Sequence, residues 1–293
     1  MRKIVKTDGE YPADLKEIYA APDALYINGS IKPEDRNAVA VVGTRRASYY
    51  GLAQCEKLAF ELALMGITVV SGMARGIDSA AHTGALRAGG RTIAVLGSGH
   101  GNIYPPENRK LYREIAKTGA VVSEFPDETP PLRGNFPKRN RIISGMSKGV
   151  VVVEAARRSG ALITANFALE QGREVFAMPG NVNSSRSAGT NTLIKDGARL
   201  AENARDIIEE LKEVLDICDT GLREKGSMRP DAPVRISETE KALLNALGDK
   251  PRPIDELKNS VGLPPSTLHE ALLRLEMKKL IRTLPGENIA RCI

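Results

Sequence analysis

A basic segment that also contains an aromatic residue and an amide lies near the middle of the chain. The stretch FPKRNR supplies these groups: Phe136, Lys138, Arg139, Asn140 and Arg141. No carboxylate occurs from residue 129 to residue 153, so the local charge has one sign and attracts a polyanion. The alternative is a solvated basic helix face, the commonest reason for a run of charges. The aromatic ring, the amide and a nearby Ser-Gly turn favour a binding site.

Two further cations follow the first apolar run of the chain, in a short turn. The turn reads GTRR and consists of Gly43, Thr44, Arg45 and Arg46. A guanidinium group binds phosphate through paired hydrogen bonds, and free N–H groups at the start of a helix also attract an anion. A tight turn with two exposed arginines is the alternative. Its place between a strand and a helix favours ligand binding.

The Ser-Gly turn opens another helix further along the chain. Ser159, Gly160 and Thr164 offer two hydroxyls beside free backbone N–H groups, which together form a cradle for an anion. The alternative is a plain serine N-cap followed by a glycine that permits close packing. The nearby basic segment supports the cradle.

Gly97, Ser98 and Gly99 end the third apolar run, in a sequence that invites comparison with a dinucleotide-binding loop. The spacing is GxGxG rather than GxGxxG, and the turn follows the third strand rather than the first. No acidic residue ends the second strand, where the ribose of a dinucleotide would be held. We therefore expect no dinucleotide here, and expect the glycines to let a phosphate backbone approach the sheet.

No set of residues predicts catalysis or metal binding. Asp78 and His82 lie at helical spacing, but without a third partner the pair is more simply a cap and a packing contact. The three cysteines are far apart and form no CxxC motif, so neither a zinc site nor a disulfide framework is indicated. We predict no catalytic residue, no metal and no cofactor.

Short apolar runs alternate with helical segments through most of the chain. The runs are Ala38–Val42, Ile67–Val70, Thr92–Leu96, Ala120–Ser123, Val150–Val153 and Glu174–Met178. Strands that are apolar throughout are typical of a parallel sheet buried on both faces. The sequence thus predicts an α/β, Rossmann-like fold with a mostly parallel sheet and helices on both faces. Such sheets bind ligands at the carboxyl ends of their strands, where the turns described above lie.

The organisation of the chain indicates a main domain and a smaller one. Residues 1–37 are predicted to be an N-terminal extension that packs on the main domain, residues 38–215. Residues 216–235, rich in Gly, Pro and charges, are predicted to be a linker. Residues 236–293 indicate three helices and a hairpin, which is a winged helix-turn-helix. Both duplex DNA and another protein remain open as partners of this small domain.

The composition is that of an ordinary globular protein. The 293 residues are 42% hydrophobic and 27% charged, and the formal net charge of +6 permits a nucleic-acid partner without requiring one. The first residues lack the apolar core of a signal peptide, and no apolar run approaches the length of a membrane span. We expect a cytoplasmic protein with no membrane partner.

Taken together, these motifs resemble those of the DNA-processing protein A family, also called DprA or Smf. The matching stretches are VGTR at 42–45, SGMARGID at 71–78, GSG…YP at 97–105, FPKRNRIISG at 136–145, EAARRSGALITA at 154–165 and PGN…GTNTLIKDGA at 179–198. They follow the family's order and cover residues 11–210.

The resemblance implies a function and a site. Members bind single-stranded DNA through a Rossmann-like domain, form homodimers and load the RecA recombinase onto incoming DNA during natural transformation. The family's DNA site maps onto Arg45, Phe136, Lys138, Arg139, Asn140, Arg141, Ser159, Gly160 and Thr164. Which of the three neighbouring cations on the basic segment contacts phosphate stays open.

Two alternatives compete with this interpretation. Rossmann-like proteins of the lysine-decarboxylase-like group hydrolyse nucleotide monophosphates and carry a PGGxGT turn. Here the comparable position has Ser159-Gly160-Ala161-Leu162 and no matching carboxylate. The second alternative is a regulator that binds duplex DNA through the winged helix.

Overall fold

The computed structural model describes residues 1–215 and, further along, residues 237–248, 251–264, 267–268, 271–272, 275, 280–284 and 288–291. The chain divides into two compact units, with the boundary after Gly221, and each is described by itself. The predicted linker 216–235 lies outside the described residues. Most of Pro265–Lys279, the third of the three helices predicted in residues 236–293, also lies outside them.

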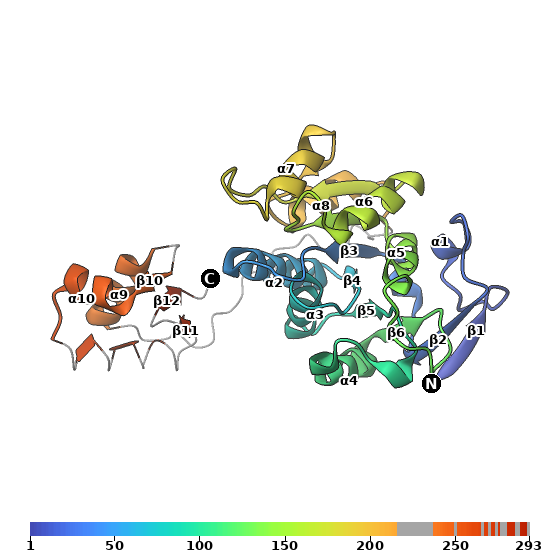
Figure 1. The fold of residues 1–293 in the computed structure, drawn as a ribbon, viewed down its shortest axis with the longest axis horizontal. Helices are drawn as coiled ribbons and strands as arrows, with labels where there is room; N and C mark the ends of the chain where they lie inside the picture. Colours follow the sequence, from blue (N-terminus) through green and yellow to red (C-terminus); the bar gives the residue numbers. More distant parts are fainter. Residues whose placement is uncertain are drawn as a thin grey trace. The chain divides into compact units, whose positions relative to one another are not determined.

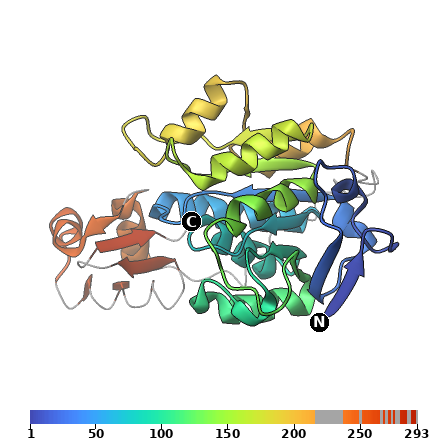
Figure 2. The ribbon, with the colours of Figure 1, turned by 45° about the vertical axis from the view of Figure 1, so that its right-hand side comes forward.

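Nine strands of the larger unit form one sheet, in the order β1-β2-β6-β5-β4-β3-β7-β8-β9 (Figures 1 and 2). The strands are β1 (Arg2–Val5), β2 (Ala24–Gly29), β3 (Ala38–Val42), β4 (Thr68–Ser71), β5 (Thr92–Val95), β6 (Ala120–Ser123), β7 (Gly149–Val152), β8 (Glu174–Ala177) and β9 (Arg199–Leu200). From β6 to β9 in this order, every neighbouring pair is parallel. The predicted α/β fold with a mostly parallel sheet is confirmed.

The chain changes direction across the sheet at β3. Strands β4, β5 and β6 are added successively on one side of β3, and β7, β8 and β9 on the other. The carboxyl ends of β3 and β7 are therefore neighbours, with Val42 opposite Val152. A reversal of this kind leaves a crevice outside the strand ends, where open α/β sheets bind their ligands.

The N-terminal segment, predicted as an extension packed on the main domain, adds two strands to the sheet. β1 pairs with β2, and β2 pairs antiparallel with β6, so that Tyr26 lies opposite Ser123. Leu25 and Ile27, on one face of β2, are fully buried. Burial of that apolar face fixes the register of β2, because a slip by one residue would expose it.

Helices cover both faces of the sheet (Figure 1). One face carries α1 (Ala13–Lys16), α5 (Asn135–Gly145), α6 (Gly160–Glu170) and α7 (Ala188–Lys195); the other carries α2 (Tyr49–Leu64), α3 (Ile77–Arg87), α4 (Arg109–Thr118) and α8 (Ala204–Leu211). Successive strand residues alternate between the two cores, as Val39 and Val41 face α2 while Ala40 and Val42 face α6. The connections also contain three short 3-10 helices, η1 (Pro33–Arg36), η2 (His100–Asn102) and η3 (Pro106–Asn108).

The described residues of the C-terminal unit form two helices and a small sheet. The elements are α9 (Glu238–Leu247), α10 (Ile254–Val261) and the strands β10 (Arg252–Pro253), β11 (Ile281–Leu284) and β12 (Asn288–Arg291), with sheet order β10-β12-β11. A capping box begins α9: Glu240 N–H donates to Ser237 Oγ, and Ser237 N–H donates to the Glu240 carboxylate. Leucines of α9 and α10 share one core with Ile281 and Ile289.

Candidate nucleic-acid interface

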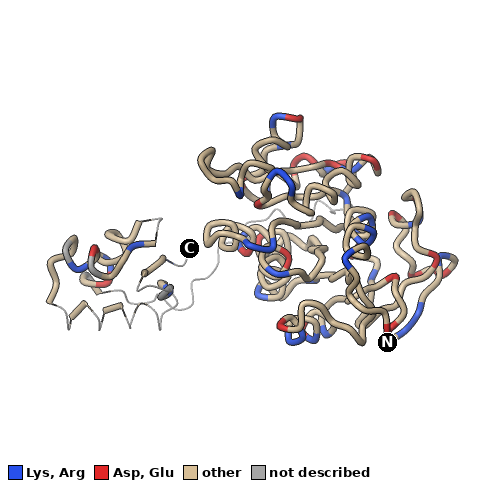
Figure 3. The backbone as a smooth tube through the Cα atoms, in the orientation of Figure 1, with Lys and Arg blue, Asp and Glu red and all other residues tan. Residues whose placement is uncertain are grey.

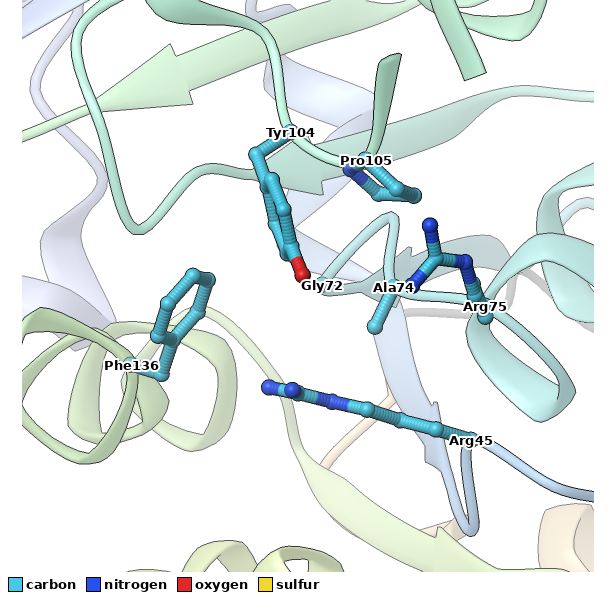
Figure 4. A pocket seen from close by; sticks show the side chains of 7 residues that line it. All are labelled: Arg45, Gly72, Ala74, Arg75, Tyr104, Pro105 and Phe136. Atoms are coloured by element: carbon cyan, nitrogen blue, oxygen red, sulfur yellow. The ribbon is translucent and has the colours of Figure 1, made fainter. Parts of the chain in front are cut away.

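A pocket opens at the carboxyl edge of the larger unit's sheet. Its lining comes from the loops after β3, β4 and β5 and from the start of α5, and consists of Arg45, Gly72, Ala74, Arg75, Tyr104, Pro105 and Phe136. Figure 4 shows Arg45 reaching toward the Phe136 ring, with the Tyr104 ring on the far side of the same space. The lining contains two cations and two aromatic rings but no carboxylate.

The cations and rings of the pocket follow one another in a row. The Arg45 guanidinium lies 5.1 Å from the centroid of the Phe136 ring, whose centroid is 5.8 Å from that of Tyr104. The Arg75 guanidinium lies 5.9 Å from the Tyr104 ring on the other side. These separations are in the range of cation–π and aromatic contacts. The contact between Arg45 and Phe136 brings the basic segment and the Gly43–Arg45 turn together.

The loop after β3 holds Arg45 in place through its backbone. Thr44 N–H donates to the carbonyl of Glu154, 2.7 Å away, and the Thr44 carbonyl accepts from Ile77 N–H at 3.2 Å. The carboxylate of Glu154 is buried and accepts from Ser48 N–H at the start of α2. With these bonds made inside the protein, the side chains of Arg45 and Arg46 remain exposed.

The loop after β4 forms the floor of the pocket. Met73 adopts a left-handed conformation with φ of 53°, unusual for a residue with a side chain, and is fully buried. Asn108 Nδ2 donates to the Met73 carbonyl at 2.8 Å, and the Asp78 carboxylate accepts from Ala74 N–H. Strained backbone that its surroundings hold in this way is concentrated at functional sites.

The three neighbouring cations of α5 have different surroundings. Lys138 is exposed and has no ion pair in the described chain. Arg139 is only 3% exposed and donates from Nη1 to the carbonyls of Gly72, at 2.7 Å, and Val95. Arg141 is largely buried and donates to the Glu124 carboxylate at 2.5 Å. Of these three cations, among which the sequence left the phosphate contact open, only Lys138 presents its charge to solvent.

The buried Arg139 charge lies among other buried polar groups. Burial lowers the pKa of Arg139 to about 10, so its guanidinium is still charged at neutral pH. Burial also raises the pKa of Asp78, although the charge of Arg139 opposes that shift. His82 Nδ1 donates to the Thr92 hydroxyl at 2.7 Å, because that hydroxyl itself donates to the Val69 carbonyl. Burial lowers the pKa of His82 to about 3, and the imidazole is therefore neutral.

The turn after β5 is buried, so the structure corrects the expectation that a phosphate approaches it. All three residues, Gly97, Ser98 and Gly99, lie below the surface. A Cβ atom on Gly97 would lie 2.7 Å from Cδ1 of Phe136, and one on Gly99 would lie 2.1 Å from the Pro126 carbonyl oxygen. Glycine is needed here because the Phe136 ring and a neighbouring loop pack directly on the backbone.

The predicted cradle at the start of α6 is only partly accessible. The Ser159 hydroxyl caps the helix by accepting from Ala161 N–H at 3.3 Å, and Gly160 is exposed. Asn140 Nδ2 donates to the Gly160 carbonyl at 3.4 Å, which links α5 to this turn. Thr164 is 1% exposed and faces the core, so its hydroxyl does not face a ligand at the surface. The geometry at Ser159 is that of a plain N-cap, which was the alternative to an anion cradle.

Of the seven lining residues the sequence predicted Arg45 and Phe136, and it missed the second cation and the second ring, Arg75 and Tyr104. Both follow strand ends, Arg75 after β4 and Tyr104 after β5, as Arg45 does after β3. A search for cationic and aromatic residues in every loop at this edge would have found them. Arg75 also forms an ion pair with Glu107 of η3.

Neither a metal site nor a membrane segment is found in the part of the chain that the structure describes. No cluster of three or more His, Cys, Asp or Glu residues in that part has the arrangement of a metal site. Within the same residues, none of the helices has the length and apolar character needed to cross a membrane.

Fold and pocket together define a Rossmann-like protein with an electropositive, aromatic-lined pocket at the carboxyl edge of its sheet. A family model described as DNA recombination-mediator protein A matches residues 2–212, and one described as DprA winged helix domain matches residues 228–287. The chain therefore belongs to the DprA/Smf family, and the resemblance noted in the sequence is confirmed.

Individual relatives agree with this assignment. Protein Smf of Escherichia coli (strain K12) is 42% identical over 294 residues, which cover 97% of this chain and 76% of the relative. The X-ray structure of DNA processing protein A from Streptococcus pneumoniae has a TM-score of 0.69 at 43% identity, over 71% of this chain and 74% of that one. A second structure concerns the single-stranded DNA binding mode of DNA processing protein A from Helicobacter pylori. It has a TM-score of 0.65 at 32% identity and covers 73% of this chain and 97% of that one.

Proposed function

We propose that this protein binds single-stranded DNA without chemical catalysis and passes the strand to the RecA recombinase in natural transformation and recombination. The observation that carries the proposal is the row Arg45, Phe136, Tyr104 and Arg75 at the carboxyl edge of the sheet. Bases of any sequence stack on aromatic rings, and cations attract the phosphates between them. Duplex DNA keeps its bases stacked inside and cannot use the rings in this way.

The chemistry of the pocket supports a binding role. Its lining has no carboxylate, and Tyr104 provides its sole side-chain hydroxyl. The hydrolysis of nucleotide monophosphates considered as an alternative needs an acid or base within hydrogen-bond reach of the substrate. Glu107, the carboxylate nearest in sequence to the lining residues, forms an ion pair with Arg75. Release of base from nucleoside monophosphates incubated with the protein would contradict the non-catalytic proposal.

We further propose a cytoplasmic homodimer. Two pockets in one particle strengthen the binding of a long strand because the second contact forms at a high effective concentration. The match to a family described as DNA recombination-mediator protein A supports the proposed loading of RecA.

The proposal is tested by competition and by salt dependence. A labelled oligothymidine is followed by fluorescence anisotropy while unlabelled single strand or duplex of equal length competes. We expect the single strand to compete better, and the affinity to fall steeply as salt rises. Equal competition by the duplex would contradict the proposal. Arg45→Gln should weaken binding, whereas Lys57→Gln, at an exposed position on α2, should not.

The recombinase step needs its own assay. RecA filament formation is measured on single strands already coated with a single-strand-binding protein, with and without this protein. We expect faster nucleation in its presence, and a weaker effect for Arg45→Gln. Unchanged nucleation would remove the recombinase from the proposal and leave strand binding untouched.

A further inference from the structure

The outward face of α4 is strongly basic. Four cations lie on it: Arg109, Lys110, Arg113 and Lys117. All four are exposed, and Figure 3 shows basic residues along this helix, at the place that Figure 1 labels α4. The opposite face is apolar and packs on the sheet through Tyr112 and Ile115. The helix is thus clearly amphipathic, with a polar face made mostly of positive charge.

The four cations share one side of the helix. With 3.6 residues per turn, successive residues are rotated by about 100°, so these four side chains fall within an arc of about 100°. That arc is centred opposite the buried Ile115. Arg109, Arg113 and Lys117 follow one another at intervals of four residues, each about 6 Å along the helix axis from the one before. They form a row of charges rather than a scattered set.

Three of these cations have no carboxylate to balance them. Within the described chain Arg109, Lys110 and Arg113 take part in no ion pair, whereas Lys117 bonds to Glu114 at 3.1 Å. Some cations on other helices and strands do have such partners, as Arg87 does with Glu56 and Arg199 with Glu210. The uncompensated charge of α4 is therefore available to an anionic ligand.

The row of cations on α4 begins next to the pocket. Pro105 lines the pocket and immediately precedes η3, which leads into α4. Arg75, at the end of the row of pocket rings, forms an ion pair with Glu107 of η3. Asn108 Nδ2 donates to the Met73 carbonyl and to the Ser79 hydroxyl, both at 2.8 Å, which fixes the start of α4 against the pocket floor.

We propose that the basic face of α4, formed by Arg109, Lys110 and Arg113, is a second phosphate-binding surface that takes the DNA strand where it leaves the pocket on the Tyr104 side. This inference rests on the proposed single-strand binding function. The face has cations but no aromatic ring, so it holds the backbone alone and is indifferent to base sequence. Its contribution grows with strand length, because a short strand fills the pocket without reaching α4.

The experiment compares strand lengths in the full-length protein. The variant is Arg109→Gln/Lys110→Gln/Arg113→Gln. Its matched control is Lys6→Gln/Lys57→Gln/Lys195→Gln, which removes three exposed cations that have no ion pair in the described chain. Anisotropy is measured with oligothymidines of about 5 nucleotides, near the lower end of typical site sizes, and of about 30 nucleotides, well beyond their upper end. The salt concentration is varied between about 50 and 200 mM.

We expect the α4 variant to bind the long strand at least about tenfold more weakly than the control, with a salt slope smaller by about 2, since each lost phosphate contact removes about 0.7. The short strand should bind equally to both. The same long-strand affinity and slope in variant and control would overturn the inference and would leave α4 as a solvated face or a docking site for an acidic protein. An equal loss of affinity for the short and the long strand would also overturn the inference. Failure of the proposed function itself appears separately, as a wild-type protein that does not prefer single strand to duplex.

Discussion

The neighbouring cations Lys138 and Arg139 offer the sharpest test of the site. Lys138 is exposed on α5, whereas Arg139 is buried and bonded to the carbonyls of Gly72 and Val95. Removing either charge lowers the formal charge of the protein equally. The structure predicts that the two changes act on different properties, Lys138→Gln on DNA binding and Arg139→Met on stability.

The magnitudes follow from the surroundings. Lys138→Gln should leave the free energy of unfolding within about 0.5 kcal/mol of wild type, as is usual for exposed sites. It should reduce the salt slope of single-strand binding by about 0.7, the share of one phosphate contact. Arg139→Met leaves two buried carbonyls without a donor, at about 1–3 kcal/mol each, and leaves the buried Asp78 without its opposing charge. A loss of about 3–5 kcal/mol is expected, from a total that is typically about 5–15 kcal/mol.

Urea unfolding followed by circular dichroism measures stability, and anisotropy with a labelled oligothymidine at several salt concentrations measures binding. If Arg139→Met proves too unstable, Arg139→Lys keeps the charge but cannot reproduce the paired geometry of a guanidinium. It should still lower the urea midpoint. The reasoning would be refuted if Arg139→Met kept wild-type stability and lowered the salt slope, because Arg139 would then be the phosphate ligand.

Three further outcomes are expected. Phe136→Ala should weaken single-strand binding by about 1–3 kcal/mol per stacked base with little change in salt slope; a changed slope with unchanged affinity would contradict this. Gly97→Val should displace the Phe136 ring, which a Cβ atom would approach to 2.7 Å, and should lower single-strand affinity in the same assay. His82→Gln should make the urea midpoint less sensitive to acid, because the pKa of His82 is about 3 in the folded protein and about 6.5 unfolded. The unfolded state gains a proton first as pH falls, so wild type should lose about 2 kcal/mol relative to the variant between pH 7 and 5, and equal losses would contradict the argument.

Most of the parallel sheet could be predicted because its strands are buried on both faces. β3 is the clearest case: all five of its residues are apolar and buried, and its predicted bounds match those found. β1 escaped prediction because it is an edge strand with two cations, and only Ile4 of its four residues is buried. The helix α7 and the two-residue strand β9 were also missed, since a Gly- and Ser-rich stretch precedes them and gives little periodic signal.

The location of the site could be predicted, but the division of labour within it could not be read from residue types. The family motifs and the strand order both place Arg45 and Phe136 at one edge. The burial of Arg139 depends on which side of α5 faces the core. In retrospect the sequence does carry that signal, because Arg139 is three and four residues before Ile142 and Ile143, which are both buried. Lys138 lies off that face and remains exposed.

Under the proposed function, the different partners of Arg45 and Arg75 would let one pocket take both a base and a phosphate. Arg75 faces the Tyr104 ring but is also paired with Glu107, so its charge is largely balanced before any ligand arrives. Arg45 faces the ring of Phe136, and no carboxylate pairs with it in the described chain. An aromatic face attracts a cation without neutralising it, so Arg45 keeps its full charge for a phosphate while its orientation is held. The pocket is thus polarised, with free charge on the Arg45 side and balanced charge on the Arg75 side. Arg109, Lys110 and Arg113, which have no ion pair in the described chain, lie at the start of α4, just after η3, and in the proposal a strand whose base stacks on one of the rings meets them along its backbone.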